Sequence, residues 1–324
     1  MSDLGHVLVL AGGVSFEREV SLSSGRRVSD ALTHLGVEVE LVDIDAYLLP
    51  RLTSDPPAAV FLAVHGVEGE DGALRDALDV AGVPYVGATG SAARLAFDKA
   101  IAKAVVARAG VRTPPSVALQ HAAFRDLGGA VLLERVVGRL GLPLVVKPAR
   151  GGSALGVSVV REAADLPQAM VNCYSYDSVA LLERHVSGTE LAVSVIDTGD
   201  GPVALPAVEI APVTGTFDYA ARYTAGMTEY HAPARLDNEL ATAAAEMAVT
   251  AHRALGLRDL SRTDLIVTAG GTIEYLETNV SPGMTATSLL PLAAAAAGID
   301  LGTLCRDLLQ RAVTRGVSTP GAPA

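Results

Sequence analysis

Apolar and polar positions follow strand-like and helix-like periods over the first 94 residues. Residues 6–10 and 58–64 are short apolar runs, and residues 37–42 alternate apolar with acidic side chains, as strands do. A helix is predicted to begin near Ser21, where hydroxyl side chains can cap free backbone N–H groups. Strands that alternate with helices predict a small parallel α/β unit.

The middle third has a different pattern. It is predicted to hold a helix and three strands, at residues 98–109, 144–147, 157–160 and 178–182. The glycine-rich residues 148–156 join two of these strands, so they predict a hairpin rather than a helix-opening nucleotide loop.

The last third again mixes strands and helices. Strands are predicted near residues 191–196, 203–210, 260–268 and 272–278, with a helix at 238–255 and a polar loop at 211–231. Gly270-Gly271 predicts the turn of a hairpin, and two helices are expected after Pro282-Gly283. The small residues at the end of the sequence predict a frayed tail.

Composition narrows the class of protein. Half of the 324 residues are apolar but only 4% are aromatic, which favours helices packed on sheets over an aromatic-rich β-barrel. The net charge of −11 argues against a nucleic-acid partner, which requires a basic surface, but not against a small anionic ligand. Cys173 and Cys305 are too few for a disulfide framework or a thiolate metal site.

Hydropathy gives no sign of a membrane protein. The mean hydropathy is +0.36, but no apolar stretch reaches the ~20 residues that a membrane helix needs. Residues 289–298 form an apolar run that contains Pro291 and stops before Asp300. No basic region precedes a long apolar one near Met1, so a secretory signal is not expected. We therefore expect a cytoplasmic protein without a membrane partner.

The hairpin around Gly270-Gly271 carries candidate metal ligands. Side chains two positions apart on a strand share a face, so Arg262 and Asp264 lie together, as do Glu277 and Asn279 on the partner strand. Two carboxylates and an amide oxygen on one face are hard ligands of the kind that Mg²⁺ uses beside nucleotide phosphates. A solvated hairpin edge is the alternative interpretation.

Cationic residues gather in the middle third. Lys147 interrupts an apolar strand, which is costly unless its ammonium group meets an anion. The loop that follows it, Arg150-Gly151-Gly152-Ser153, can surround phosphates with backbone N–H groups. A lysine whose ammonium group simply reaches solvent is the alternative.

Two loops follow predicted strands of the N-terminal unit, where open α/β sheets place ligand loops. They are residues 12–17, Gly-Gly-Val-Ser-Phe-Glu, and residues 65–72, His-Gly-Val-Glu-Gly-Glu-Asp-Gly. The Gly-x-Gly-x-x-Gly pattern is missing, so a dinucleotide cofactor is rejected and the loops are assigned to substrate. Ordinary turns remain an alternative for either loop.

Taken in order, seven segments resemble the D-alanine–D-alanine ligases, a family of the ATP-grasp superfamily that acts in peptidoglycan synthesis. They are residues 12–21 (GGVSFEREVS), 65–72, 98–99 (DK), 147–148 (KP), 218–219 with 222–223 (DY and RY), 277–279 (ETN) and 281–285 (SPGMT). The resemblance covers nearly the whole chain, from about residue 7 to 309. Each segment alone is weak evidence, but seven in this order and spacing are specific.

The resemblance implies an α/β protein with the ATP-grasp fold. An N-terminal parallel α/β substrate domain (residues 1–94) is followed by two α+β subdomains (95–182 and 183–316), which enclose ATP, and by a flexible tail (317–324). The cofactors implied are ATP and two Mg²⁺ ions, with Mn²⁺ as a possible replacement. The partners implied are D-alanine and a second copy of the chain in a homodimer.

Site residues also follow from the resemblance. The nucleotide set comprises Lys99 and Lys147 on the phosphates, the adenine hinge Glu183, Arg184, His185 and Val186, Glu190 on the ribose, and Arg222. The Mg²⁺ ligands are Asp264, Glu277 and Asn279. The set that joins the first substrate's site to the closing loops is Glu17, Ser153 and Tyr223. The groups around the two D-amino acids are His65, Arg262, the Gly283 amide and Ser288.

The sequence departs from the family pattern at three positions. Ala154 stands where a second serine is often found, Arg222 where lysine is common, and Arg75 where glutamine is common. An arginine keeps the charge of lysine but changes the geometry of its hydrogen bonds. These departures bear on rate and loop closure rather than on the presence of activity.

The chemistry implied is ATP-driven amide formation. The carboxylate of one D-alanine attacks the γ-phosphorus to give D-alanyl phosphate and ADP, and the amine of the second D-alanine then displaces phosphate. Arg262 and the Gly283 N–H would stabilise the tetrahedral oxyanion. The Ser153 loop and the 211–231 loop would exclude water.

Other functions stay open at this point. One is a ligase of the same fold with D-lactate or D-serine as acceptor, or with a secondary-pathway role; Tyr223 favours D-alanine by resemblance. Another is a non-catalytic nucleotide-binding sensor, which would not need the intact metal-ligand set. A flavodoxin-like binding protein built on the first third alone is the weakest.

Overall fold

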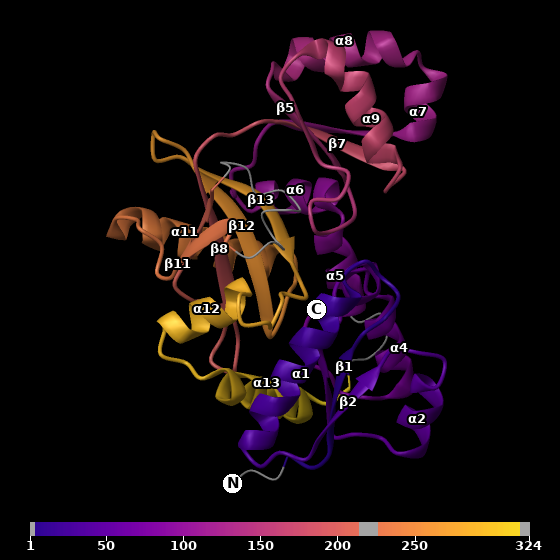
Figure 1. The fold of residues 1–324 in the computed structure, drawn as a ribbon, viewed down its shortest axis with the longest axis vertical. Coiled ribbons are helices and arrows are strands. Elements are labelled where there is room, and N and C mark those ends of the chain that lie inside the picture. The colour runs from indigo at the N-terminus through magenta and orange to yellow at the C-terminus, as the bar shows by residue number, and fades with distance from the viewer. Residues whose placement is uncertain (1–3, 214–225, 318–324) are drawn as a thin grey trace.

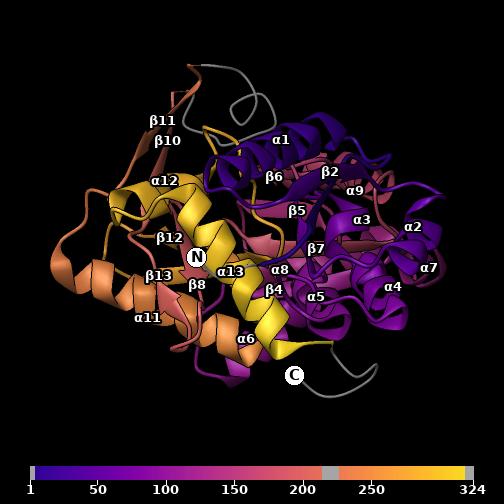
Figure 2. The ribbon, with the colours of Figure 1, turned by 90° about the horizontal axis from the view of Figure 1, so that it is seen from below.

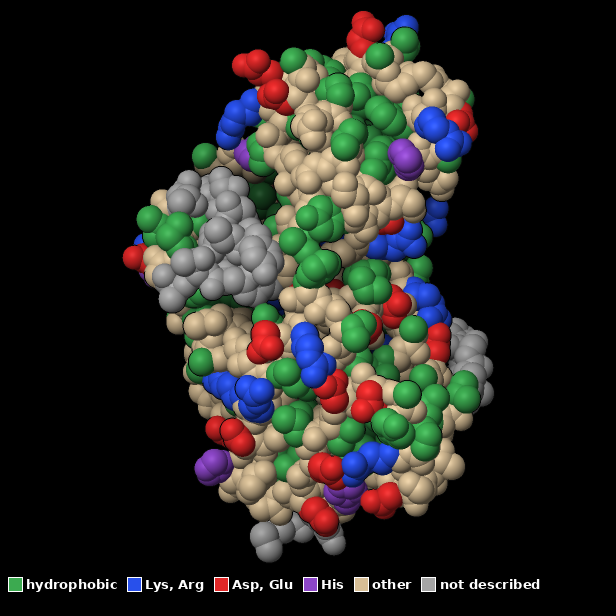
Figure 3. Space-filling model, turned by 45° about the vertical axis from the view of Figure 1, so that its right-hand side comes forward, with side chains coloured by type: hydrophobic (Ala, Val, Ile, Leu, Met, Phe, Trp, Pro, Cys, Tyr) green, Lys and Arg blue, Asp and Glu red, His purple; other side chains and the backbone are tan. Residues whose placement is uncertain are grey.

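Three β-sheets organise the residues that the structure describes (Figure 1). The computed structural model describes residues 4–213 and 226–317. In Figure 1 a four-stranded sheet lies in the upper lobe, while a three-stranded and a six-stranded sheet lie in the body. Figure 3 shows the molecule narrowing between lobe and body, and on the face drawn there acidic and basic side chains are interspersed.

The three-stranded sheet is parallel, which confirms the predicted N-terminal unit. Its order is β2-β1-β3, with β1 at Val7–Ala11, β2 at Val39–Asp43 and β3 at Ala59–Leu62. Five helices belong to this unit: α1 (Arg18–His34), α2 (Leu48–Ser54), α3 (Val67–Glu70), α4 (Ala73–Ala81) and α5 (Gly90–Phe97).

Both faces of β1 are buried, which explains its uninterrupted apolar run. Val7 and Val9 pack in one core with Leu32 of α1. Leu8 packs in another core, with Leu52 of α2. A strand covered by helices on both sides has no polar face to show in the sequence.

The helix predicted to begin near Ser21 is present as α1, but the capping role predicted for the hydroxyl group is wrong for Ser21. The helix begins at Arg18, and the Ser21 hydroxyl accepts a hydrogen bond from Gly12 N (2.8 Å) while donating to Ala63 O (2.8 Å). Ser21 therefore joins the ends of β1 and β3 instead of capping its own helix.

The four-stranded sheet is antiparallel throughout, with the order β4-β7-β5-β6. Its strands are β4 (Ser116–Gln120), β5 (Leu144–Pro148), β6 (Ser158–Val160) and β7 (Val179–Arg184), and β5 and β6 form the predicted hairpin. The short helix η1 (Ala163–Asp165) and the helices α7 (His121–Asp126), α8 (Gly129–Leu140) and α9 (Leu166–Tyr174) accompany it. The predicted helix at 98–109 is confirmed as α6 (Lys99–Arg108), with the Asp98 side chain as its N-cap.

The six-stranded sheet has the order β11-β10-β8-β12-β13, with β9 paired to β8. Its strands are β8 (Thr189–Ile196), β9 (Val203–Ala204), β10 (Val208–Pro212), β11 (Thr228–His231), β12 (Leu260–Val267) and β13 (Ile273–Asn279). The predicted hairpin at Gly270-Gly271 is confirmed as β12 and β13.

Two predictions in this region need correction. The single strand expected at 203–210 is two strands, because Pro206 between them has no N–H to donate to a ladder. The polar loop expected at 211–231 is shorter, since β10 runs to Pro212 and pairs with β11 at Thr228–His231.

Helices cover both faces of the six-stranded sheet. The predicted helix α11 (Asn238–Ala254) packs on one face through Ala244, Ala248 and Ala251. The two helices predicted after Pro282-Gly283 are α12 (Leu289–Ala296) and α13 (Leu301–Arg315), and they share the core on the other face. Figure 2 shows α13 running beside this sheet towards the N-terminal unit, where it contacts α1 and β3.

No single helix among the described residues is long and apolar enough to cross a membrane. The α12 and α13 pair meets the length and composition test jointly, but the two helices are bent by 104° at the break between them.

One buried carboxylate ties three parts of the body together. Asp259, just before β12, is fully buried and accepts hydrogen bonds from Arg315 of α13 at 2.6 and 2.8 Å. It also accepts one from Gly87 N at 2.8 Å. Its backbone is left-handed, with φ 63°, a conformation that aspartate and asparagine tolerate.

We expect Asp259→Asn to lower the free energy of unfolding by about 2 to 3 kcal/mol, because the amide keeps the turn but loses the charge that Arg315 needs. Thermal and denaturant unfolding would measure the change. Asp307→Asn is the control, since Asp307 pairs with Arg306 in solvent and its loss should cost less than about 1 kcal/mol. Equal effects for the two substitutions would contradict this prediction.

Candidate active site

Two cavities meet at the centre of the molecule. The larger, about 600 Å³, is lined by strands of the four-stranded and six-stranded sheets. The smaller, about 200 Å³, is lined by the six-stranded sheet, the loops of the N-terminal unit and the start of α12. Lys99, Glu277 and residues 151–153 line both. The larger cavity has the size of a small-molecule site.

The glycine loop between β5 and β6 reaches the N-terminal unit. Ser153 Oγ donates a hydrogen bond to Glu17 Oε1, although 136 positions separate the two residues. A Cβ at Gly152 would come within 3.0 Å of the same carboxylate oxygen. Ser153 and Ala154 have left-handed backbones with φ of 54° and 57°, which stores strain in residues other than glycine. The structure thus brings together Glu17 and Ser153, as the sequence predicted.

The larger cavity combines apolar walls with a polar edge. Its apolar lining comes from both sheets and from the loop between β5 and β6: Val145, Leu155, Val157, Val159, Leu191, Ile210, Leu265 and Leu276. The predicted hinge residues Glu183, Arg184, His185 and Val186 line it together with Glu190. Backbone N–H groups of Arg184 and His185 donate to Pro115 O and Pro143 O, both at 3.0 Å, and so fix the hinge. A flat apolar ring with polar groups at its rim suits this space.

Each predicted phosphate-binding lysine contacts a carboxylate. Lys147 Nζ lies 2.5 Å from Glu183 Oε1. Lys99 Nζ lies 3.2 Å from Glu277 Oε2 and donates to Gly151 O at 2.6 Å. The sequence-based expectation that the Lys147 ammonium meets an anion is therefore confirmed, and the anion is a side chain of the protein.

The predicted metal ligands lie side by side on β12 and β13. Asp264 is the cross-strand partner of Glu277, and Arg262 is that of Asn279. A register shift follows Asp264. β12 lies between β8 and β13, and β13 is covered by α5 and α6, so the alternative of a solvated hairpin edge is wrong.

Arg262 is buried and bound at one side only. Its Nε and one terminal nitrogen donate to Asp264 at 2.7 and 2.8 Å, and Nη1 has no acceptor among the residues that the structure describes. Burial by itself would lower the pKa of Arg262, but the Asp264 carboxylate keeps that pKa above its ordinary value. Arg262 thus stays charged, with a donor left for an anion in the smaller cavity.

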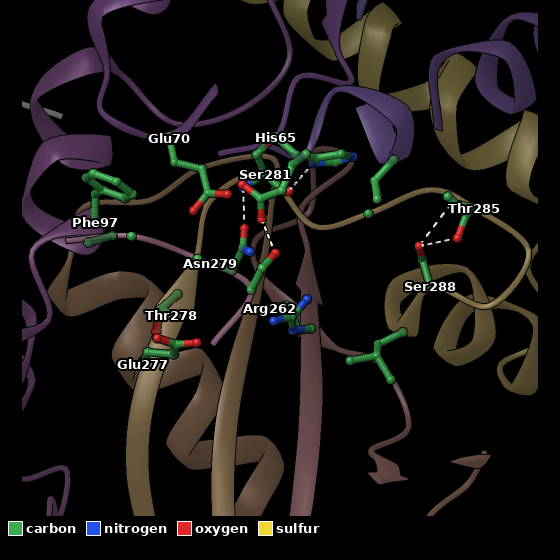
Figure 4. Close-up of a pocket in the computed structure, with 18 of the residues that line it drawn as sticks. His65, Glu70, Phe97, Arg262, Glu277, Thr278, Asn279, Ser281, Thr285 and Ser288 are labelled. Atoms are coloured by element: carbon green, nitrogen blue, oxygen red, sulfur yellow. Dashed lines mark hydrogen bonds between the residues drawn. The ribbon is translucent and has the colours of Figure 1, made fainter. Parts of the chain in front are cut away.

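The loop after β13 forms another wall of the smaller cavity. A Cβ at Gly283 would lie 2.5 Å from Ser288 Oγ, so a side chain there would displace the Ser288 hydroxyl. Ser288 precedes α12, and its hydroxyl accepts from Thr285 N at 3.0 Å. The N-terminus of a helix attracts carboxylates, because its first N–H groups are unpaired. Figure 4 shows Ser288 across this space from Glu277.

His65 supports the wall rather than presenting a free ring nitrogen. Its Nδ1 lies 2.9 Å from Ser281 O, which can only accept, so Nδ1 carries the proton. Its Nε2 lies 2.9 Å from Ser24 Oγ and accepts from that hydroxyl. Burial lowers the pKa of His65 to about 4, so the ring is neutral near pH 7. A direct contact of His65 with substrate stays a prediction.

Three buried charged residues near the cavities were missed as functional candidates. Glu70 lines the smaller cavity, where burial and then the Glu17 carboxylate raise the pKa of Glu70 to about 8. Arg75 donates to Gly69 O and to Val280 O, which joins the 65–72 loop to the end of β13. Lys103 pairs with Glu183 at 2.8 Å. Only Lys103 had a local signal, since it follows Lys99 by one helical turn.

Two of the predicted site residues, Arg222 and Tyr223, lie outside the described residues. The remaining members of the predicted set line one or both cavities, in agreement with the grouping made from the sequence.

An antiparallel hairpin lobe that closes over a larger cavity, with carboxylates on the facing sheet, is the arrangement of an ATP-grasp protein. A family model described as D-ala D-ala ligase C-terminus matches residues 105–310. The D-alanine--D-alanine ligase of Pelotomaculum thermopropionicum is 39% identical over 305 residues, which cover 94% of this chain and 96% of that protein.

Solved structures agree with the family model. A Bacillus anthracis D-alanine--D-alanine ligase complexed with ATP aligns with a TM-score of 0.80 and 28% identity, over 96% of this chain and 97% of that one. The VanG D-Ala:D-Ser ligase of Enterococcus faecalis aligns with a TM-score of 0.81 and 26% identity, over 95% and 99%. The chain belongs to the D-alanine–D-alanine ligase family, and the predicted ATP-grasp fold is confirmed.

The neutral His65 predicts a pH dependence of stability. The unfolded chain binds a proton at this histidine near pH 6.5, whereas the folded chain does so only near pH 4. Stability is therefore lost as the pH falls from about 6.5 to 4, by up to about 3 kcal/mol. His65→Gln should flatten this part of a plot of unfolding midpoint against pH, while His34→Gln, on the exposed side of α1, should leave it unchanged. An unaltered slope in His65→Gln would refute the assignment.

Proposed function

We propose that this chain joins two D-alanine molecules into D-alanyl-D-alanine and converts ATP to ADP and phosphate as it does so. The observation that carries the proposal is the shared wall of Lys99, Glu277 and the glycine loop. With this shared wall, a phosphoryl donor bound in the larger cavity would lie beside small amino acids bound in the smaller one. The family relationship supports the same reaction.

The larger cavity takes the nucleotide. Its apolar walls hold the base, Glu190 binds the ribose hydroxyls, and Lys147 and Lys99 bind the phosphates. Backbone N–H groups of the glycine loop add donors for phosphate oxygens. In this assignment Arg222 is a further phosphate contact by resemblance.

Asp264, Glu277 and Asn279 are proposed to hold Mg²⁺, for which Mn²⁺ could substitute. They offer two carboxylates and an amide oxygen from facing positions of two strands, which are hard ligands suited to this ion. No cluster of three His, Cys, Asp or Glu within residues 4–213 and 226–317 could hold a metal alone, so phosphate oxygens and water complete the set. When bound, the ion neutralises charge on the transferred phosphoryl group.

The smaller cavity takes the two amino acids. Glu17 provides a carboxylate for an ammonium ion, and the start of α12 provides N–H groups for a carboxylate. The free donor of Arg262 and the Gly283 N–H stabilise the oxyanion formed when the second amine attacks the acyl phosphate. The Ser153–Glu17 contact holds the glycine loop over this space and keeps water from the acyl phosphate.

A homodimer and a cytoplasmic location complete the proposal. The homodimer follows from the family resemblance, and the cytoplasmic location follows from the sequence pattern.

Glu277→Gln should lower D-alanine-dependent phosphate release at least about 100-fold, because it removes a charge from the phosphoryl-transfer site at nearly constant size. A coupled phosphate assay measures this rate. The matched control is Glu209→Gln in β10 of the same sheet, since Glu209 pairs with Arg235 and lines neither cavity. Near-normal release by a folded Glu277→Gln variant would rule out the role given to Glu277.

Competition among acceptors tests the substrate. With D-alanine, D-serine and D-lactate at equal concentrations near pH 7.5, we expect D-alanyl-D-alanine as the main product by mass. The Glu17 carboxylate in the smaller cavity favours an ammonium group over a hydroxyl. D-serine should give a minor product, because the nearby Val20, Phe97 and Leu289 reject an added hydroxyl only weakly. A majority of D-alanyl-D-serine or D-alanyl-D-lactate would identify a different ligase.

A further inference from the structure

The chain has three lysines, and each pairs with a carboxylate at or near the larger cavity. Lys103 and Lys147 pair with Glu183, and Lys99 pairs with Glu277. Of the 25 basic residues only Lys99, Lys103 and Lys147 are lysines; the others are arginines. Lys99 and Lys147 line the larger cavity, where the proposed function gives them phosphate. Lys103 has no role in that reaction, yet it is only 4% exposed.

Glu183 is held between two of these lysines. Lys147 Nζ lies 2.5 Å from Oε1, and Lys103 Nζ lies 2.8 Å from Oε2. The Glu183 side chain is 3% exposed, and Lys103 also donates to Tyr275 O at 3.4 Å. α6 therefore anchors the hinge strand β7 to β13 through one ammonium group.

The two lysines differ in their access to a ligand. Lys147 lines the cavity, so a nucleotide phosphate competes with Glu183 for it. Lys103 is not among the residues that line this cavity, so it stays with Glu183. Burial alone would raise the pKa of Glu183, but the two ammonium groups bring that pKa below its ordinary value.

An ionised carboxylate can only accept hydrogen bonds and offers about four acceptor sites, and one lysine ammonium group lies beside each oxygen of Glu183. In the cavity it can accept from the amino group of a 6-aminopurine. It repels the carbonyl oxygen that a 6-oxopurine presents at the same place. A neutral carboxyl group or an amide could donate to that oxygen and would lose this discrimination.

We infer that Lys103 is a positioning residue that keeps Glu183 ionised and fixed while a nucleotide occupies the cavity, and that it thereby sets the preference for ATP over GTP. The inference rests on the proposed nucleotide site. A compact ammonium group fits the closed space behind Glu183, where the larger arginine fork would not.

Steady-state kinetics of Lys103→Met and Lys103→Gln with ATP and GTP test the inference. Removing one member of a buried charge pair is costly, so we expect KM for ATP to rise roughly tenfold or more. The ratio of kcat/KM for ATP to that for GTP should fall by roughly the same factor, while KM for D-alanine stays unchanged. An unchanged ATP to GTP ratio in a folded variant would overturn the inference.

A double-mutant comparison tests whether Lys103 acts through Glu183. Glu183→Gln alone should lower the ATP to GTP ratio, and adding Lys103→Met should change it no further. A further fall in the double variant would overturn the inference. If neither single Lys103 variant folds, this comparison alone decides, since removing both members of a buried pair is better tolerated.

Two control variants distinguish the effect of Lys103 from general destabilisation and from loss of phosphate binding. Arg315→Met breaks the buried pair with Asp259 far from the cavity and should lower stability without changing the ATP to GTP ratio. A changed ratio in Arg315→Met would show that destabilisation alone moves it and would overturn the inference. Lys147→Ala should raise KM for ATP, because it removes a phosphate contact. An unchanged KM in Lys147→Ala would overturn the nucleotide site itself rather than the role of Lys103 alone.

Discussion

The register between β12 and β13 is the constraint on which the rest of the site depends. It places Asp264 opposite Glu277 and Arg262 opposite Asn279. Side chains alternate between the two faces of a strand. If β13 slipped by one residue against β12, Glu277 and Asn279 would therefore point into the core. The register is held by β8, which pairs with β12 along its whole length, and by the buried bond between Thr263 and Thr278 at 3.1 Å. The positions of the four polar side chains are thus fixed by strand pairing with β8 and by contacts on the opposite face of the sheet.

The cationic side chains of the site pair with its carboxylates. Lys99 pairs with Glu277, Lys147 with Glu183, and the Arg262 guanidinium with Asp264. A nucleotide alone would take the lysines and leave carboxylates unpaired, whereas a metal–nucleotide complex brings an anion for the cations and a cation for the carboxylates. Under the proposed function, metal and nucleotide bind together. The lysines then exchange carboxylates for phosphates and the carboxylates exchange lysines for the metal ion, so no buried charge is left unpaired.

Local patterns in the sequence predicted the β12–β13 hairpin, the helix α6 and the ligand face of the hairpin, because these depend on spacings of two and four residues. Contacts between distant segments could not be predicted in this way. Glu183 lies 80 positions from Lys103, and no local rule joins them. In the sequence, Glu70 cannot be distinguished from the other acidic residues of its loop. Its burial follows only from the fold. Ser21 resembled a helix cap because its partners, Gly12 and Ala63, come from two other segments.

The packing of α13 against α1 and β3 has a consequence for synthesis of the chain. Leu308 and Leu309 share a core with Val7 and Leu32, so the first sheet receives part of its apolar cover from a helix that is synthesised only after residue 300. At bacterial elongation rates this leaves that face open for on the order of tens of seconds. The N-terminal unit is therefore exposed to chaperones and to aggregation until α13 has been synthesised and can pack on it.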